Sequence, residues 1–201
     1  MTRAVGGVLK MPLPQSPGEV EGATNRVTTS PTSRRGTLTF EGDQATLRFE
    51  RRIPHPIEAV WEALTEPEHL ARWYLTKAVI DGRTGGSIDF HTGPGQLHVT
   101  GRILVWEPPR VFEYEWKVQP WGRMPNGEDA IVRWELRPEG QETLLTLTHR
   151  KLTRQSALGA RPATHVVLDR LEAQLAGLPF EDFRERVSKV QEQYPTREED
   201  R

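Results

Sequence analysis

The sequence predicts an α+β fold, in which a curved antiparallel sheet of about seven strands wraps around a long C-terminal helix beside two short helices. Alternating apolar and polar residues, interrupted by turns rich in Gly, Pro, Asn and Asp, run from residue 37 to residue 151 and predict the strands. Two short stretches with helical spacing lie early in this region, and one long stretch follows it. The sheet needs a cover for its apolar face, and the long stretch is the only long helix that the sequence offers.

The chain of 201 residues suits one domain of ordinary size with appendages. Residues 1–36 contain 17 Gly, Pro, Ser or Thr and no aromatic residue, so they cannot bury enough apolar area to offset their ordering entropy. We therefore expect a disordered tail at 1–36, the folded domain at 37–177, and an amphipathic helix with a charged end at 178–201.

Charge and composition exclude several classes of protein. Residues 1–36 hold five basic and two acidic residues, so the remainder carries 22 basic and 26 acidic residues, a net charge of −4. An acidic body argues against nucleic acid as the main partner. The absence of cysteine rules out disulfides and a thiol nucleophile. No apolar run approaches the ~20 residues of a membrane span, and no signal peptide is recognisable, so we expect a cytoplasmic protein with no membrane partner.

The domain begins with a strand and two short helices. Alternation over 37–53 predicts a long first strand, which the turn-like EGDQ could fold back on itself. PHPIEAVWEAL (54–64) has helical spacing behind a proline and predicts the first helix. TEPEHLARWYL (65–75) predicts the second, because Thr65 and Glu68 stand in the relation of a capping box. Its buried face would carry Leu70, Trp73 and Tyr74.

Besides these elements, the sequence predicts two further helices, two irregular loops and six more strands. Helical period returns at 162–176, where Pro162 suits a first turn, and a further amphipathic helix of about four turns begins at Phe180. Two irregular loops, 119–128 and 152–162, are candidates for the mouth of a cavity. The other strands of the sheet are predicted at 77–80, 86–91, 96–107, 110–118, 129–138 and 142–151.

Strand alternation places aromatic side chains on one face of the sheet. In RVFEYEWKV, Phe112, Tyr114 and Trp116 share one face, and the charged residues share the other. The next two strands, IVRWELR and LLTLTHRK, carry their own apolar faces, which would join the first. These faces consist of Val132, Trp134, Leu136, Leu145, Leu147 and His149.

Strand, two short helices, antiparallel strands and a long C-terminal helix together form the helix-grip arrangement. The segments IPHPIEAVWEALTEPEHLARWY, GGSIDF, GRILVWEPPRVFEYEW, LLTLTH and LDRLEAQL resemble the SRPBCC (START-like) superfamily, and within it the homologues of the heat-shock-protein-90 ATPase activator. The resemblance covers about residues 44–177 and implies a cavity between sheet and long helix, closed at one end by Trp73. Where many relatives carry Gly-Trp, this chain has Ala163-Thr164, which would leave room in the cavity or be compensated by aromatic residues of the sheet.

Our main hypothesis is a non-enzymatic binding module that holds a small hydrophobic or aromatic ligand in this cavity, without a metal or other cofactor. His149 is either a core histidine with a satisfied hydrogen bond or the polar contact that orients the ligand. The expected ligand-binding residues are Trp73, Phe90, Phe112, Tyr114, Trp116, Trp134, Leu147, His149, Leu168 and Leu171.

Two alternatives stay open. The family name implies a co-chaperone-like or other protein-interaction role, in which a protein partner or a second copy of the chain would bind the Trp121 loop and the helix from Phe180. Related helix-grip proteins also include polyketide cyclases and aromatases, which are enzymes. That function needs polar groups converging inside, and the candidates are His149, Tyr114 and, if the strand register shifts by one residue, Arg133.

The sequence contains no recognised catalytic or metal-binding motif. The six histidines lack the spacing of known ligand sets, although His91 and His98 flank the TGPG turn and could be cross-strand neighbours at the surface. There is no nucleophile elbow, P-loop or dinucleotide fingerprint. The paired carboxylates Glu113 and Glu115 lie on the polar face of their strand, where we expect them to be solvated.

Overall fold

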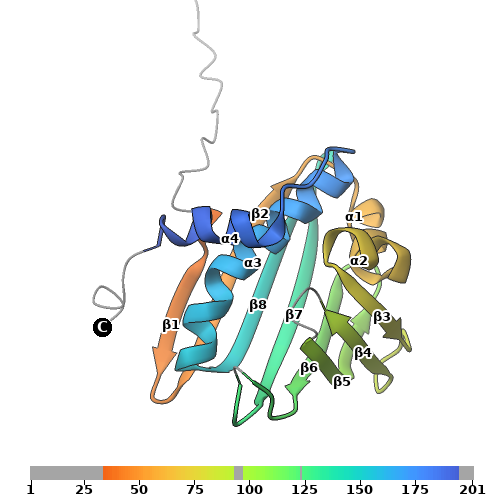
Figure 1. The fold of residues 1–201 in the computed structure, drawn as a ribbon. Coiled ribbons are helices and arrows are strands. Elements are labelled where there is room, and N and C mark those ends of the chain that lie inside the picture. The colour runs from red at the N-terminus through yellow and green to blue at the C-terminus, as the bar shows by residue number, and fades with distance from the viewer. Residues whose placement is uncertain (1–33, 93–96, 123, 195–201) are drawn as a thin grey trace, which may run out of the picture.

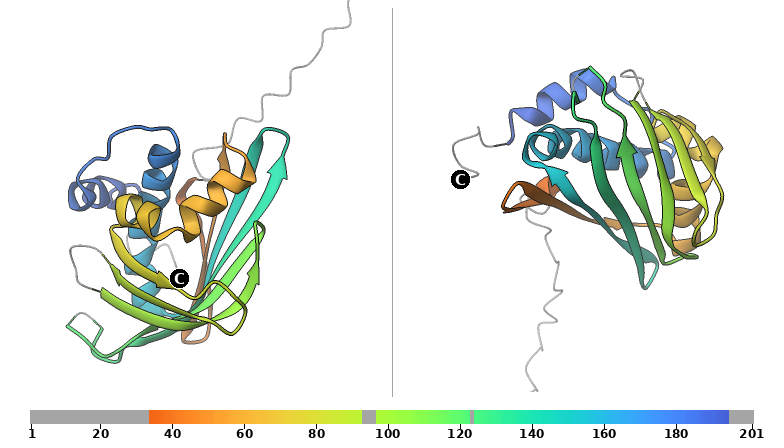
Figure 2. Two further views of the ribbon diagram at one scale, coloured as in Figure 1. Left: turned by 90° about the vertical axis from the view of Figure 1, so that its right-hand side faces the viewer. Right: turned by 90° about the horizontal axis from the view of Figure 1, so that it is seen from below.

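The computed structural model describes residues 34–92, 97–122 and 124–194. Residues 1–33 of the predicted tail and the charged end at 195–201 lie outside the described residues. The described chain forms one eight-stranded sheet with the strand order β1-β2-β8-β7-β6-β5-β4-β3, and the long helix α3 lies across its concave face (Figure 1). Figure 2 shows the curvature of the sheet and the position of all four helices on one side of it.

All neighbouring strands pair antiparallel, and the order along the chain is the predicted one. The strands are β1 Thr37–Glu41, β2 Gln44–Ile53, β3 Thr76–Ile80, β4 Ser87–Thr92, β5 Leu97–Glu107, β6 Val111–Val118, β7 Glu128–Glu139 and β8 Glu142–Thr153. The helices are α1 Ile57–Thr65, α2 Pro67–Trp73, α3 Arg154–Leu175 and α4 Phe183–Gln191.

The predicted helix-grip fold is confirmed, with eight strands where about seven were expected. The difference comes from the first strand, which is a hairpin of β1 and β2 closed by the pair Glu41 and Gln44. Gly42, with φ 59°, occupies the first position of the two-residue loop, where a positive φ is favoured and glycine adopts it without steric cost.

The helices α1 and α2 cover one end of the sheet, but the predicted capping box is wrong. The N-cap of α2 is Glu66, whose side chain makes no capping hydrogen bond, and Pro67 is the first helical residue. A proline at this position fixes the start of the helix and keeps the preceding residue extended. Thr65 instead ends α1, where its hydroxyl donates to the carbonyl of Trp61 at 2.9 Å.

The long helix begins earlier than predicted, so the expected loop at 152–162 is wrong. Thr153 is the N-cap of α3, and its hydroxyl accepts a hydrogen bond from the backbone N–H of Ser156 at 3.2 Å. The Glu128 carboxylate in turn accepts from the N–H and the hydroxyl of Thr153, both at 3.0 Å. Pro162 therefore lies inside the helix rather than in its first turn, where it removes one backbone hydrogen bond.

The last helix packs on the domain itself. Asp182 caps α4 by accepting from the N–H groups of Arg184 and Glu185, and the helix has nine residues, fewer than the predicted four turns. Val190 and Tyr194 are buried against Val166 of α3, so part of the apolar stripe is used within the chain. None of the helices in the described ranges has the length and apolar composition of a bilayer span.

The outer face of the sheet contains one feature that contradicts the sequence analysis. Glu113 is buried rather than solvated, because Arg133 on β7 and Arg150 on β8 enclose its carboxylate. The shortest contacts are 2.8 Å from Arg133 and 3.0 Å from Arg150. Glu115 is half-buried and pairs with Lys117 at 3.0 Å.

Candidate functional site

A cavity of about 1050 Å³ lies between the concave face of the sheet and α3. Its sheet wall is formed by Trp116 on β6, Val132 and Trp134 on β7, and Leu147 and His149 on β8. These residues come together because the register pairs Val132 with His149 and Trp134 with Leu147, on the same face. The wall is largely aromatic and apolar, as is usual in sites for small organic molecules.

The helix wall of the cavity consists of small side chains. Ser156, Gly159, Ala160, Ala163 and Thr164 lie at positions i, i+3, i+4, i+7 and i+8, which share one face of the helix, and all line the cavity. Gln155 and Val167 line it at the two ends of this row. Because none of the side chains within the row is large, the helix cannot fill the space in front of the indoles of β6 and β7. Ala163 and Thr164, which stand where many relatives carry Gly-Trp, therefore lie on the cavity side of α3.

His149 is the most buried titratable group in the cavity wall. Its residue is 8% exposed, and its ring packs edge-on against Trp116 with 5.1 Å between centroids. Burial lowers the pKa of His149 to about 3, so the imidazole is neutral at physiological pH. Its Nε2 atom has no hydrogen-bond partner among the described residues, which is unusual for a buried polar atom.

Tyr74 is a second polar ring in the cavity wall. Burial raises the pKa of Tyr74 to about 12, although a hydrogen bond with the indole of Trp116 opposes the shift. The phenol is therefore protonated at neutral pH. Among the described residues that line the cavity, Arg184 is the one with a permanent charge.

Four of the ten residues predicted to bind a ligand line this cavity, namely Trp116, Trp134, Leu147 and His149. The other six are buried in the hydrophobic core instead. Their role as ligand contacts stays a prediction without support from the cavity's outline. They are Trp73, Phe90, Phe112, Tyr114, Leu168 and Leu171.

The core position of Phe112 follows from the aromatic residues around it. Trp61 of α1 and Trp106 of β5 contact each other edge-on at 5.1 Å, and both pack against Phe112. Phe112 in turn lies 4.7 Å from Tyr114, which packs edge-on against Phe90 at 5.8 Å. This cluster fills the end of the concave face beneath α1 and α2, so the cavity occupies only the other end.

Trp73 lies one layer behind the cavity. Its indole N–H donates to the carbonyl of Ala63 at 2.8 Å, and the side chain is fully buried. The ring stacks on Tyr74 and meets Trp134 edge-on, and both of these neighbours line the cavity. Trp73 thus supports two wall residues.

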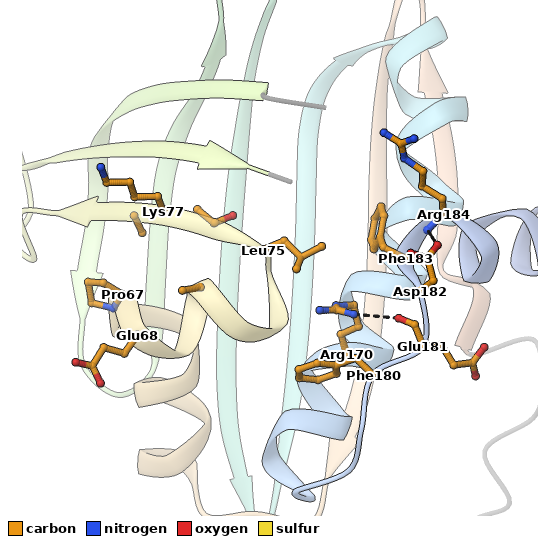
Figure 3. Close-up of a pocket in the computed structure, with 13 residues that line it drawn as sticks. Pro67, Glu68, Leu75, Lys77, Arg170, Phe180, Glu181, Asp182, Phe183 and Arg184 are labelled. Carbon is orange, nitrogen blue, oxygen red and sulfur yellow. Dashed lines mark hydrogen bonds between the residues drawn. The ribbon is translucent and has the colours of Figure 1, made fainter. Parts of the chain in front are cut away.

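The cavity reaches Phe183, Arg184 and Val187 of α4, directly after the segment that connects α3 to α4. A second, outer hollow of about 1020 Å³ lies between this segment and the α2–β3 region, and it shares Leu75, Phe183 and Arg184 with the cavity. Figure 3 shows the side chains of Leu75 and Phe183 facing each other across this boundary. Leu75 has φ 54°, a conformation that costs a leucine about 1–2 kcal/mol.

Arg170 fixes the connection at this boundary. From α3 it donates to the carbonyls of Arg72 and Trp73 at the end of α2, at 3.0 and 2.8 Å, and to that of Glu181 at 3.2 Å. Its guanidinium lies 4.2 Å from the ring centre of Phe180. Arg170 could not be predicted from the sequence, because backbone carbonyls brought together by the fold leave no pattern in the sequence.

The opposite rim is formed by the β6–β7 loop, including Trp121, Met124 and Asn126. Trp121 is 45% exposed, and its backbone pairs with that of Met124. The loop at 119–128 was predicted to form the mouth of a cavity, and it lies at the cavity's edge. Arg133, in contrast, does not point inside: its guanidinium binds Glu113 and Glu135 on the outer face.

Comparison with known families identifies the chain. A family model described as activator of Hsp90 ATPase homolog 1-like protein matches residues 54–176. The chain belongs to this family. It is thus a member of the SRPBCC superfamily, as the sequence motifs indicated. No curated protein matches the chain.

Solved structures share the fold of this protein. CalU16 from Micromonospora echinospora is 23% identical, with a TM-score of 0.59 over 78% of this chain and 91% of its own. A protein from Bordetella parapertussis is 26% identical, with a TM-score of 0.60 over 79% of this chain and 87% of its own. A conserved protein of unknown function from Enterococcus faecalis is 16% identical, with a TM-score of 0.60 over 79% and 89%.

The residues matched by the family model begin at α1 and end at α3. The hairpin of β1 and β2 and the helix α4 therefore lie outside them. Since Phe183, Arg184 and Val187 all line the cavity, part of the cavity boundary in this protein comes from outside the matched region.

Proposed function

We propose that this protein is a non-enzymatic binding module that holds a small hydrophobic or aromatic ligand in the cavity between β6–β8 and α3. The observation that carries the proposal is the unpaired Nε2 of His149 in an otherwise apolar, aromatic wall. A buried polar atom without a partner costs about 1–3 kcal/mol, and a ligand hydroxyl, carbonyl or N–H would remove that cost. The volume of about 1050 Å³ also suits a small organic molecule.

The chemistry of the wall favours an uncharged ligand. Because His149 is neutral and Tyr74 is protonated, neither group supplies a charge to pair with an ionised ligand deep inside. Arg184 lies at the boundary with the outer hollow rather than in the sheet wall. We therefore expect a planar apolar body with one neutral polar group that reaches His149.

Filling the cavity from the helix side tests this proposal. Thr164→Trp would place an indole in the space while leaving the aromatic sheet wall unchanged, and Ser188→Trp adds the same side chain at an exposed position of α4. The probe is 2-naphthol, which has an aromatic body and one hydroxyl, and binding is measured by calorimetry on the full chain. We expect saturable binding to the unchanged protein and to Ser188→Trp, and at least about tenfold weaker binding to Thr164→Trp.

A second variant tests the role of His149. His149→Leu keeps an apolar side chain of similar size but removes the nitrogen, so it should weaken binding of 2-naphthol and leave binding of naphthalene nearly unchanged. A loss of about 1 kcal/mol for one hydrogen bond corresponds to roughly fivefold in affinity.

Equal binding of 2-naphthol to Thr164→Trp and to the unchanged protein would contradict the cavity assignment.

A co-chaperone-like role is a second candidate, and exposed apolar side chains favour it. Trp121 at the cavity rim is 45% exposed, Leu178 is 60% exposed and Phe180 is 36% exposed, and such residues often mark interaction surfaces. Stimulation of an Hsp90-type ATPase by the full chain, reduced by Trp121→Ser and Leu178→Ser but not by Thr164→Trp, would support this role.

An enzyme resembling polyketide cyclases or aromatases is a third candidate, with less support. It requires converging polar groups, and the polar rings of the cavity wall are His149 and Tyr74. Arg133 lies on the outer face with its carboxylate partners, and Tyr114 is in the core, where its hydroxyl accepts from the Trp134 indole at 3.5 Å.

A further inference from the structure

Two histidines lie directly opposite each other on the outer face of the sheet, and their side chains do not line the cavity. His91 on β4 and His98 on β5 are register partners, and strand alternation places them on the face opposite Phe90. Opposed residues of antiparallel strands have Cβ atoms about 4.5–5.5 Å apart. The imidazole rings stack with 4.2 Å between centroids and 12° between planes. The register of β4 and β5 therefore places the two rings next to each other, whichever rotamers the side chains adopt.

A carboxylate completes this pair. Asp89 precedes His91 by two residues and shares its face of β4. Its Oδ1 atom lies 3.2 Å from Nε2 of His91 and 3.1 Å from Nε2 of His98. The three ligand atoms all lie within 4.8 Å of one another. One carboxylate oxygen thus faces both imidazole nitrogens.

These distances suit a tetrahedral metal site. Zinc binds histidine nitrogen at about 2.0–2.1 Å and carboxylate oxygen at about 2.0–2.2 Å. Two ligands at such bond lengths, in tetrahedral directions, are about 3.3–3.4 Å apart. The contacts from Asp89 to the two histidines are 3.2 and 3.1 Å, so each of these pairs needs only a small outward shift. The two imidazole planes differ by 12° in their stacked arrangement, so at least one ring must also turn until both nitrogens point at the ion. Imidazole and carboxylate are also ligands that Zn²⁺, Cu²⁺ and Ni²⁺ accept.

The exposure of the cluster determines the kind of site. The side chains of Asp89, His91 and His98 are each about half exposed, so a fourth coordination position would face solvent. Lys77 on β3 is the register partner of His91, and Lys117 on β6 pairs with the residue opposite Asp89. Lys77 adds positive charge nearby, whereas Lys117 is paired with Glu115. The expected affinity is therefore micromolar, weaker than that of a closed structural zinc site.

We propose that Asp89, His91 and His98 form a three-ligand site for a divalent transition-metal ion, with Zn²⁺ as the expected ion, that ties β4 to β5 on the outer face of the sheet. This site is independent of the cavity and of the proposed ligand. It also revises the expectation that the two histidines are ordinary surface groups. The sequence did not reveal the third ligand, because Asp89 joins the pair only through strand alternation and the β4–β5 register.

Calorimetric titration of Zn²⁺ into the full chain, purified without a histidine tag, tests the proposal. We expect one ion per chain, with binding weakened at least about tenfold in each of His91→Ala, His98→Ala and Asp89→Asn, since even outer-shell changes cause losses of that size. The control is His55→Ala, which removes a half-buried histidine outside the cluster and should leave the affinity unchanged. All four changes are at positions that are not fully buried, and circular dichroism verifies that the variants fold.

Thermal unfolding provides a second readout. At a Zn²⁺ concentration a hundred times the dissociation constant, Tm should rise on the order of 5–10 °C, and EDTA should reverse the rise. In His91→Ala the same concentration should raise Tm by no more than about half as much, because tenfold weaker binding halves the stabilisation. The proposal is overturned if Zn²⁺ fails to bind saturably, or if His91→Ala and His98→Ala bind it as tightly as the unchanged protein.

Discussion

The hydroxyl of Tyr194 lies 2.9 Å from Nδ1 of His165 and donates to the carbonyl of Arg35 at 3.0 Å. One phenol thereby connects the end of α4, the middle of α3 and the segment that precedes β1. Arg161 stacks on the same ring at 4.7 Å and donates to the carbonyl of Gly36. The two ends of the described chain are therefore held against the outer side of α3 by one shared cluster.

Tyr194→Phe should lower the free energy of unfolding by about 1–3 kcal/mol, because it leaves buried polar partners without the hydroxyl. Urea denaturation of the full chain measures the change. Ser188→Ala, at an exposed position of α4, is the matched control and should stay within about 0.5 kcal/mol of the unchanged protein. Equal stability of Tyr194→Phe and the control would show that the hydroxyl does not hold α4 in place.

The stability of the protein should fall as pH is lowered from 7 to 5. Burial lowers the pKa of His149 to about 3 and that of His165 to about 4, below the ordinary value of 6.5. In this range the two histidines bind protons in the unfolded chain but not in the folded chain. Their contribution to the free energy of unfolding is therefore complete above pH 6.5 and decreases as the pH falls below it. For His149 the loss by pH 5 is about 2 kcal/mol.

Urea denaturation at pH 7 and pH 5 measures this loss. His149→Leu should reduce the difference between the two pH values, and His55→Ala should not. If the unchanged protein is equally stable at both pH values, then His149 is not buried in its neutral form. The interval above pH 5 is chosen because the pKa of Glu113 is lowered. Protonation of that carboxylate therefore changes the free energy of unfolding only at lower pH.

The paired carboxylates of β6 should differ in their effect on stability. Glu113→Gln removes the charge that binds both Arg133 and Arg150 and should cost about 1.5–3 kcal/mol, the range for hydrogen bonds to charged groups. Glu115→Gln changes a more exposed pair with Lys117 and should cost less than about 1 kcal/mol. Chemical denaturation compares the two variants, and equal costs would contradict the enclosed position of Glu113.

Much of the sheet could be predicted from local pattern alone. Alternation identified the inward face of β6, β7 and β8, because one buried face requires a period of two, and it placed Trp116, Trp134, Leu147 and His149 correctly on that face. The same rule could not say which part of the face is filled. The filled part depends on Trp106 of β5, whose ring packs against Phe112 of β6 and Trp61 of α1. These contacts are set by three-dimensional packing.

The helices were less predictable because their ends depend on distant residues. The start of α3 is fixed by Glu128, 25 residues before Thr153 in the sequence, and this partner outweighs the signal of Pro162. The position of α4 depends on Arg170, which binds backbone carbonyls of Arg72, Trp73 and Glu181. Neither contact has a sequence signature, so the boundary of the cavity beside α4 could not be expected.

Two glycine-to-alanine changes should shift stability in opposite directions. A Cβ at Gly101 of β5 would overlap the carbonyl oxygen of Glu115, so Gly101→Ala must displace backbone and should cost at least about 1–3 kcal/mol. A Cβ at Gly159 of α3 would meet no atom, and Gly159→Ala should add about 0.5–1 kcal/mol through its helix propensity. Thermal and urea denaturation measure both, and loss of stability in Gly159→Ala would contradict the open space at that position.

The facing pair Leu75 and Phe183 should control exchange of a bound ligand, if the cavity binds one as proposed. Phe183→Ala shortens a half-buried side chain that lines both hollows, so 2-naphthol should enter and leave about tenfold faster while its affinity changes less. Phe180→Ala is the control, since Phe180 lines only the outer hollow. Stopped-flow fluorescence gives both rates. Unchanged rates in Phe183→Ala, or equal acceleration in both variants, would show that ligand passes elsewhere, with the rim at Trp121 as the remaining route.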